Sequence, residues 1–138
     1  MLTVSNLSKR YGNVLALQNV SFHILEKESA GIFAAAGPAG PALCSLLSGL
    51  IECRPGQISI GGLDMGKSAE KARALVGYLP KGNPLYGDMS VFEYLEFICS
   101  LYKIPGKSRR ARIGQALELC GLAGQRDSLI RDLSALDS

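Results

Sequence analysis

The chain has 138 residues, of which 47% are hydrophobic and 20% are charged, and its formal net charge is +3. This balance is that of a globular domain with a real core, and it excludes a largely disordered chain. No apolar run approaches the roughly 18 residues that a membrane-spanning helix needs, and no signal peptide is predicted, so we expect a cytoplasmic protein.

The positive charge is weak evidence for binding to nucleic acid. Its one dense cluster lies at residues 107–112 and has no aromatic residues interleaved with it. A surface that binds nucleic acid usually combines both features. We therefore interpret the cluster as the solvated start of a helix and expect no nucleic-acid partner.

The N-terminal residues predict an antiparallel pair of strands. Residues 2–7 alternate apolar and polar side chains, and residues 17–24 do so nearly as regularly. This period of two is typical of a half-buried strand. Tyr11-Gly12-Asn13, which lies between the two runs, predicts a turn.

Residues 31–50 predict a buried strand, a tight loop and a helix. The apolar run 31–36 enters a loop of Gly, Pro and Ala, and the leucines that follow are spaced for one face of a helix ending near Leu50. In P-loop proteins, this arrangement directs backbone N–H groups and the positive helix N-terminus toward phosphate. Pro41 suits a first helical turn, but Pro38 and Pro41 have no N–H, so the loop offers few donors to an anion.

A second phosphate-loop pattern follows a short predicted strand over residues 57–62. Gly61, Gly66, Lys67 and Ser68 complete the pattern G-x-x-x-x-G-K-S, which here precedes a predicted helix over 68–75. The preceding strand alternates, whereas a P-loop normally follows a buried, continuously apolar strand. Two interpretations stay open: an alternative phosphate site, and a surface connection that matches the pattern by chance, which we favour.

The remainder of the chain predicts one more strand and two helices. Residues 75–80 are apolar enough for a strand. Ser90 and Glu93 have the spacing of a capping box, and the apolar stripe after them predicts a helix over 91–102. A second helix has apolar residues on one face from Ile113 and closes at Gly121.

Several of these segments, in this order, resemble the ATP-binding subunits of ABC transporters. The N-terminal part of the resemblance is carried by Leu7-Ser8-Lys9-Arg10-Tyr11-Gly12 and by Ala16-Leu17-Gln18-Asn19-Val20-Ser21-Phe22. Later parts are carried by Ile32-Phe33, Gly37-Pro38, Gly40, Leu46-Leu47-Ser48-Gly49-Leu50, Gln57-Ile58-Ser59-Ile60-Gly61 and Val76-Gly77-Tyr78-Leu79-Pro80.

The resemblance implies an α/β fold, namely an incomplete P-loop NTPase domain of the ABC type. It would have an N-terminal antiparallel β-subdomain and the start of a helical subdomain. We accordingly expect residues 1–82 to hold the β-subdomain with a partial P-loop core, and residues 83–138 to hold a partial helical subdomain.

The resemblance also implies a nucleotide site. Tyr11 would stack on adenine, Ala16 would lie against the base or ribose, and Gly37 and Gly40 would belong to the phosphate loop. Lys81 stands where the family usually has the Gln that reaches toward magnesium and the attacking water. A cation cannot coordinate Mg²⁺, so that role is excluded at this position.

The phosphate loop is degenerate when it is compared with the family. The simplest alignment deletes the family's Lys-Ser-Thr between Ala42 and Leu43. That lysine would neutralise the β- and γ-phosphates, and the hydroxyl would bind Mg²⁺. The family's signature beyond Leu133-Ser134 and its later Asp-Glu strand are absent from the sequence as well.

The resulting functional expectation is a truncated, degenerate ABC ATP-binding subunit. We expect weak ATP binding, doubtful Mg²⁺ binding, no other metal site, and little or no hydrolysis by this chain alone. The resemblance implies two partners, a membrane-spanning transporter subunit and a second ATP-binding subunit. It thus implies peripheral attachment at the inner face of the membrane through a partner, without direct insertion. The alternative is a non-catalytic interaction module that docks on either partner.

Overall fold

The predicted N-terminal strand pair is present as β1 (Leu2–Tyr11) and β2 (Val14–Ile24). The two strands pair antiparallel along their whole length, from Leu2 opposite Ile24 to Tyr11 opposite Val14. Gly12 begins the turn between them with a φ of +54°, a conformation that costs glycine little because it has no Cβ. The antiparallel prediction is therefore confirmed, and both strands are longer than the alternation indicated.

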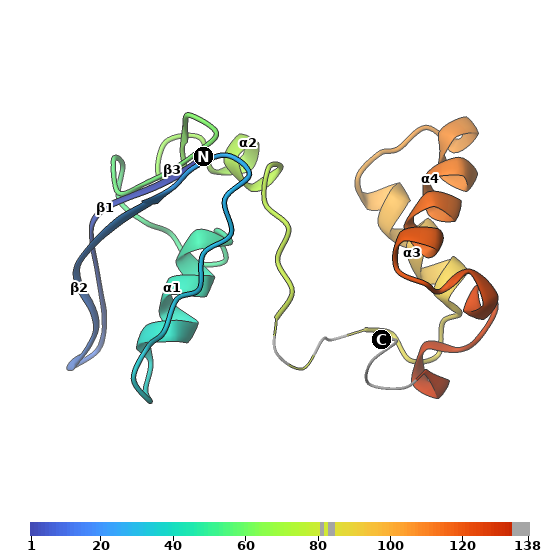
Figure 1. The fold of residues 1–138 in the computed structure, drawn as a ribbon, viewed down its shortest axis with the longest axis horizontal. Helices are drawn as coiled ribbons and strands as arrows, with labels where there is room; N and C mark the ends of the chain where they lie inside the picture. Colours follow the sequence, from blue (N-terminus) through green and yellow to red (C-terminus); the bar gives the residue numbers. More distant parts are fainter. Residues whose placement is uncertain (81, 83–84, 134–138) are drawn as a thin grey trace. The chain divides into compact units, whose positions relative to one another are not determined.

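Two short strands extend this sheet in the computed structural model, which describes residues 1–80, 82 and 85–133. β3 (Ile58–Ile60) pairs with β1, and β4 (Leu63–Asp64) pairs with β3, so the strand order is β2-β1-β3-β4 with antiparallel neighbours throughout. Figure 1 shows these strands beside α1 (Ala39–Leu47) and the short α2 (Ala69–Arg73).

The core of this part of the chain is formed by apolar residues of the sheet and of the first helix. Its buried members are Val4, Leu7, Ala16, Leu17, Ala42, Leu43, Leu46, Ile58, Met65 and Ala72. The predicted helix is confirmed, although it ends at Leu47 rather than near Leu50. Gly49 has a φ of +72°, and a residue in this left-handed conformation terminates a helix.

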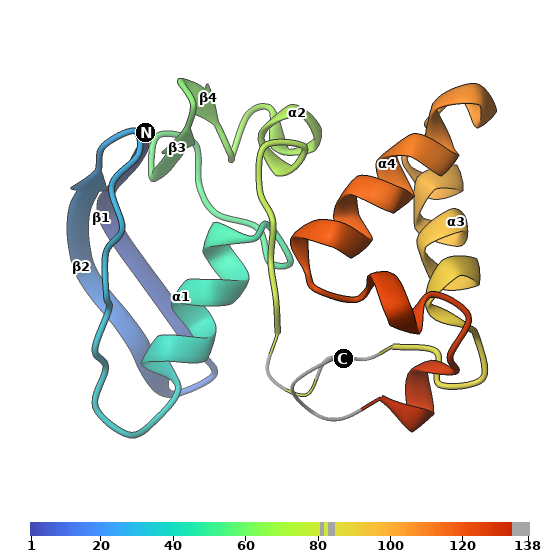
Figure 2. The ribbon, with the colours of Figure 1, turned by 45° about the vertical axis from the view of Figure 1, so that its right-hand side comes forward.

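Two predicted strands are wrong. Residues 31–36 and 76–80 have no strand structure, and the whole of 31–36 is exposed, with Phe33 at 100%. Leu75 lies in the turn after α2. A strand is stable only when its backbone N–H and C=O groups pair with a neighbour, and among the described residues no strand pairs with either segment. Both segments are plain extended loops in Figures 1 and 2.

The chain divides into two compact units, Met1–Tyr78 and Leu79–Ser138. The second unit contains α3 (Val91–Leu101), α4 (Gly106–Leu119) and the 3-10 turns η1 (Ala123–Gln125) and η2 (Ile130–Asp132). Its core consists of Val91, Cys99, Ile113, Leu117 and Ile130. Both predicted helices are therefore confirmed. The assignment of 1–82 to a nucleotide-binding core and of 83–138 to a helical subdomain stays a prediction.

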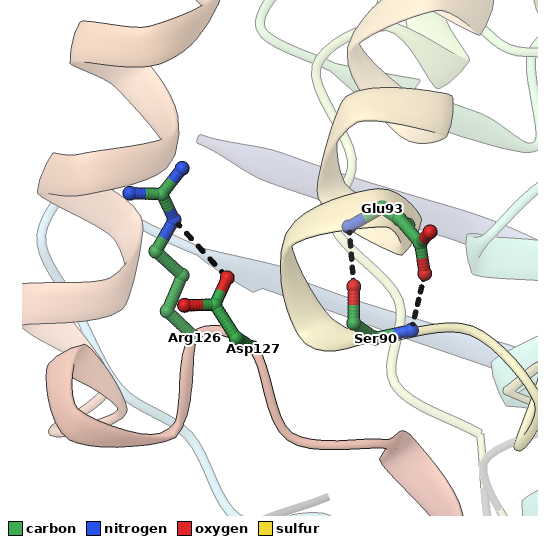
Figure 3. Close-up of polar contacts among 4 residues, drawn as sticks. All are labelled: Ser90, Glu93, Arg126 and Asp127. Atoms are coloured by element: carbon green, nitrogen blue, oxygen red, sulfur yellow. Dashed lines mark hydrogen bonds and ion pairs between the residues drawn. The ribbon is translucent and has the colours of Figure 1, made fainter.

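The predicted capping box begins α3. Ser90 Oγ accepts a hydrogen bond from Glu93 N at 3.2 Å, and Glu93 Oε2 accepts one from Ser90 N at 2.8 Å (Figure 3). The Ser90 N–H that donates to the Glu93 carboxylate, and hydrogen bonding of this carboxylate with the Ser90 side chain, lower the pKa of the Glu93 carboxyl. An N-cap of this kind typically stabilises a helix by about 1 kcal/mol. Nearby, Arg126 Nε lies 3.8 Å from Asp127 Oδ1.

Candidate functional site

The loop that precedes α1 leaves two backbone donors free at the N-terminus of the helix. Gly37 has a φ of +139°, which L-residues rarely adopt, and Pro38 caps the helix without a side-chain hydrogen bond. Ala42 N donates to Pro38 O at 3.0 Å, and Pro41 has no N–H. Within the described chain, the N–H groups of Ala39 and Gly40 are therefore the helix donors left for a ligand.

No cation or hydroxyl supplements these donors from the loop itself. Residues 37–44 contain only Gly, Pro, Ala, Leu and Cys. Leu43, the first large side chain after the loop, is buried in the core rather than turned toward the loop's surface. A Cβ on Gly40 would lie 3.7 Å from Ala34 Cβ, which is an ordinary contact, so this glycine is not required by packing. The loop therefore offers backbone dipoles but no side-chain charge.

The two residues assigned to the base and ribose have different surroundings. Tyr11 lies at the end of β1, where its side chain is 43% exposed and Lys9 Nζ is 5.9 Å from the ring centroid. Ala16 is only 9% exposed and belongs to the core on β2. The Tyr11 ring is thus accessible for stacking on a flat ligand, whereas Ala16 offers little surface. Their roles in nucleotide binding stay predictions.

The second phosphate-loop pattern has its backbone donors already occupied by Asp64. Asp64 Oδ1 accepts from Gly66 N at 2.8 Å, and Asp64 Oδ2 accepts from Gly56 N at 2.8 Å. The Asp64 carbonyl accepts from Lys67 N at 3.2 Å and from Ser68 N at 2.8 Å. A phosphate cradle needs these N–H groups free, and it gains nothing from a carboxylate beside it.

Packing explains the glycines of this pattern. Gly61 has a φ of +56° in the turn between β3 and β4. A Cβ on Gly66 would lie 2.5 Å from Pro55 N and 2.7 Å from Arg54 C, so no side chain fits there. Ser68 precedes α2, which has five residues, and Lys67 is exposed. These contacts support the interpretation as a surface connection, and the phosphate role of this segment stays untested.

Sequence reasoning missed Asp64, the residue that organises this turn. The signal was present as Asp64-Met65-Gly66, because an aspartate often accepts a hydrogen bond from the backbone two residues ahead. Partial desolvation by itself raises the pKa of the Asp64 carboxyl, but the hydrogen bonds from Gly56 N and Gly66 N outweigh it. The pKa is therefore lower than its ordinary value.

The pKa of Asp64 predicts an acid-sensitive contribution to stability. A carboxyl whose pKa is lower in the folded than in the unfolded state stabilises the fold above its unfolded pKa, and this contribution is lost as pH falls through the folded pKa. We expect Asp64→Asn to be less stable than wild type at pH 7, and the difference to shrink below about pH 4. Urea unfolding between neutral and acidic pH measures this. Asp127→Asn, at an exposed carboxyl outside the turn, is the control, and parallel pH profiles for wild type and Asp64→Asn would refute the prediction.

Two further expectations concern metals and the membrane. Across residues 1–80, 82 and 85–133, no three His, Cys, Asp or Glu side chains are grouped to hold a metal ion. Of the helices described, none has the length and apolar character to cross a bilayer. Lys81, the predicted Gln position, lies outside the described residues.

Comparison of the sequence finds relatives among bacterial transport proteins, while no protein-family model matches. The chain is 32% identical to the methionine import ATP-binding protein MetN of Geobacillus kaustophilus over 97% of its own length and 42% of the relative's. It is 29% identical to the linearmycin resistance ATP-binding protein LnrL of Bacillus subtilis, over 97% of its own length and 43% of the relative's. A third relative, the cytochrome c biogenesis ATP-binding export protein CcmA of Xanthomonas oryzae, is 35% identical over 84% of this chain and 52% of its own. The chain thus spans about half the length of the curated relatives it matches.

Comparison of the fold finds similar solved structures among proteins of ABC transporters and ATP-binding cassettes. The ATP-binding subunit of an ABC transporter is similar with a TM-score of 0.79 and 25% identity, over 96% of this chain and 55% of that one. For cbiO1 of Clostridium perfringens, part of the transporter complex cbiONQ, the TM-score is 0.81 at 24% identity, over 96% and 55% of the two chains. A dimeric ATP-binding cassette, MJ0796, bound to ADP and Pi, has a TM-score of 0.77 at 20% identity, over 97% of this chain and 63% of that one.

Proposed function

Because this chain is homologous to ABC transporter ATP-binding proteins and has the fold of an incomplete ABC ATPase domain, we propose that it is a degenerate nucleotide-binding module of that family. In this proposal it binds ATP weakly and has little or no ATPase activity by itself. The observation that carries the proposal is the loop at residues 37–42, which keeps the turn and the helix N-terminus but has no lysine.

Nucleotide binding would rest on few contacts. The accessible ring of Tyr11 would stack on the adenine, and the N–H groups of Ala39 and Gly40 would donate to phosphate oxygens. Base stacking on an aromatic side chain contributes about 1–3 kcal/mol, so without a lysine the affinity would stay low. The relatives support ATP as the nucleotide, since they are named as ATP-binding proteins.

Magnesium does not fit the residues of this loop. Mg²⁺ takes oxygen ligands, and residues 37–44 carry no side chain with an oxygen atom. Phosphoryl transfer depends on positioned phosphates, a metal ion and an oriented nucleophile together. A loop that supplies only two helix N–H groups supports binding without hydrolysis.

The partners proposed for this chain are a membrane-spanning transporter subunit and a second ATP-binding subunit, at the cytoplasmic face of a membrane. Two of the similar structures support them, because one is part of the transporter complex cbiONQ and another is dimeric.

The alternative function, a non-catalytic interaction module, is favoured by one feature of the second unit. An apolar groove of about 170 Å³ lies between α3, α4 and the C-terminal turns, and its wall includes Leu85, Leu95, Ala116 and Leu122. Such a groove suits the apolar side chains of a protein partner.

Calorimetric titration of the folded chain with Mg²⁺-ATP tests the proposed function. Tyr11→Ala is expected to weaken binding about fivefold or more, since the loss of one stacking contact costs at least about 1 kcal/mol. Lys67→Ala, the matched variant in the second pattern, is expected to bind as wild type does. Binding that needs Lys67 but not Tyr11 would move the site to residues 61–68. If the titration with Mg²⁺-ATP gives no binding heat and the chain binds a transporter subunit without nucleotide, the result would support the alternative function as an interaction module.

A further inference from the structure

The segment that joins α3 to α4, residues 101–112, carries a dense group of cations without matching anions, and we call it the basic turn. No Asp or Glu occurs between residues 97 and 117. Within the part of the chain that the structure describes, no cation of the basic turn pairs with a carboxylate. Its exposed cations are Lys103, Lys107, Arg110 and Arg112. Ions of the solvent, rather than the protein, therefore balance their charge.

Helix stability does not explain where these cations lie. Lys107 is in the first turn of α4 and Arg110 follows it closely, at the end where the positive pole of the helix dipole favours acidic residues. The first turn of α4 has no acidic residue, and its N-cap makes no side-chain hydrogen bond. Cations at this end weaken the helix, and an anion bound from outside would relieve the repulsion.

Lys103 occupies a backbone position that favours glycine. Two hydrogen bonds close the end of α3, from Lys103 N to Ser100 O at 3.0 Å and from Ile104 N to Cys99 O at 2.9 Å. In a helix ending of this kind, the residue at the place of Lys103 is left-handed, here with a φ of +53°. A lysine at the end of α3 interacts well with the dipole, but glycine adopts this φ more easily. Lys103 thus adds a charge to the basic turn where the backbone favours glycine.

Two large side chains beside these cations are exposed as well. Tyr102 is 73% exposed and Leu101 is 59% exposed, and both directly precede Lys103. Figure 2 shows the connection between α3 and α4 at the end of the helix pair away from η1 and η2. Arg109 Nε donates to Ile104 O at 2.8 Å, which ties the start of α4 to this connection. The basic turn therefore presents an apolar tip next to a group of cations.

An anionic lipid surface fits this combination. Lys and Arg near such a surface are attracted to its charge, and Tyr is enriched at the level of the headgroups, where its ring meets both water and apolar chains. A surface for nucleic acid would instead have aromatic residues interleaved with the cations, and residues 107–112 contain none. The charge and the exposed apolar tip together thus favour lipid.

We propose that the basic turn is an attachment site for anionic phospholipid. Tyr102 and Leu101 enter the headgroup layer, and the exposed cations of the turn contact lipid phosphates. This contact lies at the surface of the bilayer and does not cross it. The proposal adds a direct contact with lipid to the attachment through a partner proposed above, and it does not depend on that attachment.

The test is flotation of the full chain with lipid vesicles, without nucleotide or a partner. Vesicles of phosphatidylcholine with phosphatidylglycerol are the anionic probe, and vesicles of phosphatidylcholine alone are the neutral one. We expect binding to the anionic vesicles only. Binding is expected to weaken by about tenfold or more when salt is raised from about 0.1 M to about 1 M, because the Debye length falls from about 10 Å to about 3 Å.

A fluorescent variant reports whether the tip itself meets the lipid. The chain has no tryptophan, so Tyr102→Trp introduces a single one. Its emission is expected to shift to shorter wavelength with the anionic vesicles, because the ring leaves water. Leu119→Trp, at an 88% exposed position near the other end of α4, is the matched control and is expected to show no shift.

Charge variants separate lipid binding from folding. Lys103→Gly is expected to weaken binding to anionic vesicles about fivefold without lowering the thermal stability, since glycine suits the left-handed backbone there. The triple variant Lys107→Gln, Arg110→Gln, Arg112→Gln is expected to weaken binding about a hundredfold. Lys71→Ala, at an exposed lysine of α2, is the control and is expected to bind as wild type does.

Each other outcome overturns the proposal. Absence of binding, or equal binding to both kinds of vesicle, would exclude an anionic lipid site. Binding that the charge variants leave unchanged, or an unshifted tryptophan at position 102, would place the contact elsewhere. A short DNA duplex that binds more tightly than the anionic vesicles, with the same dependence on Lys103, would make nucleic acid the occupant. These readouts involve neither ATP nor a transporter subunit, so they fail or succeed independently of the proposed function.

Discussion

Leu46→Ala is expected to lower the free energy of unfolding of the first unit by about 2–5 kcal/mol. Leu46 is 1% exposed and lies in α1, packed in the same core as Leu7 and Ile58 of the sheet. Removal of its branched side chain loses apolar burial and leaves a cavity between the helix and the strands. In a unit with one sheet and one substantial helix over it, this loss is a large part of the total stability.

Urea unfolding followed by circular dichroism measures this effect. Leu50→Ala is the matched control, because Leu50 is 69% exposed beyond the end of α1, and its truncation is expected to change stability by about 0.5 kcal/mol or less. Equal effects of the two substitutions would mean that α1 does not pack on the sheet through Leu46.

Insertion of Lys-Ser-Thr between Ala42 and Leu43 is expected to tighten Mg²⁺-ATP binding by at least about tenfold, or about 1.4 kcal/mol. The inserted lysine would supply a positive charge near the β- and γ-phosphates, and the hydroxyls would supply oxygen ligands for Mg²⁺. Three residues add most of one helical turn, so Leu43 and Leu46 are expected to keep their places in the core.

The control for this experiment is insertion of Ala-Ala-Ala at the same place, which changes the length of α1 without adding charge or oxygen. Titration with Mg²⁺-ATP should separate the two variants, while their thermal unfolding should be similar. If both insertions bind ATP as weakly as wild type does, the absent Lys-Ser-Thr is not what limits affinity, and the degenerate-loop proposal fails.

Local periodicity predicted the elements whose partners are close in the sequence. β1 and β2 are joined by a tight turn, and α3 begins at a capping box made by Ser90 and Glu93. For these elements, only the lengths differed from the prediction. The alternation of the second run was imperfect because the β1–β2 pairing contains register shifts, and Asn6 and Asn19 adopt positive φ near them.

Whether an apolar run finds a distant pairing partner could not be predicted in this way. The apolar run at 31–36 has a strand-forming sequence, but a strand also needs a neighbour, which a local pattern does not report. The candidate site has the same limit. The resemblance assigned both Tyr11 and Ala16 to the nucleotide site. Their exposure differs, however, and it depends on how the strands pack against α1.

The close packing of Gly66 against Arg54 and Pro55 has a consequence for mutational tolerance. Saturation mutagenesis would find position 66 intolerant of every side chain, whereas exposed Lys67 would accept most of them. In an alignment of homologues, an invariant glycine at position 66 beside a variable residue at position 67 would therefore reflect a steric requirement imposed by the neighbouring backbone. Evolution can keep half of a phosphate-loop pattern in this way for a reason that has nothing to do with phosphate.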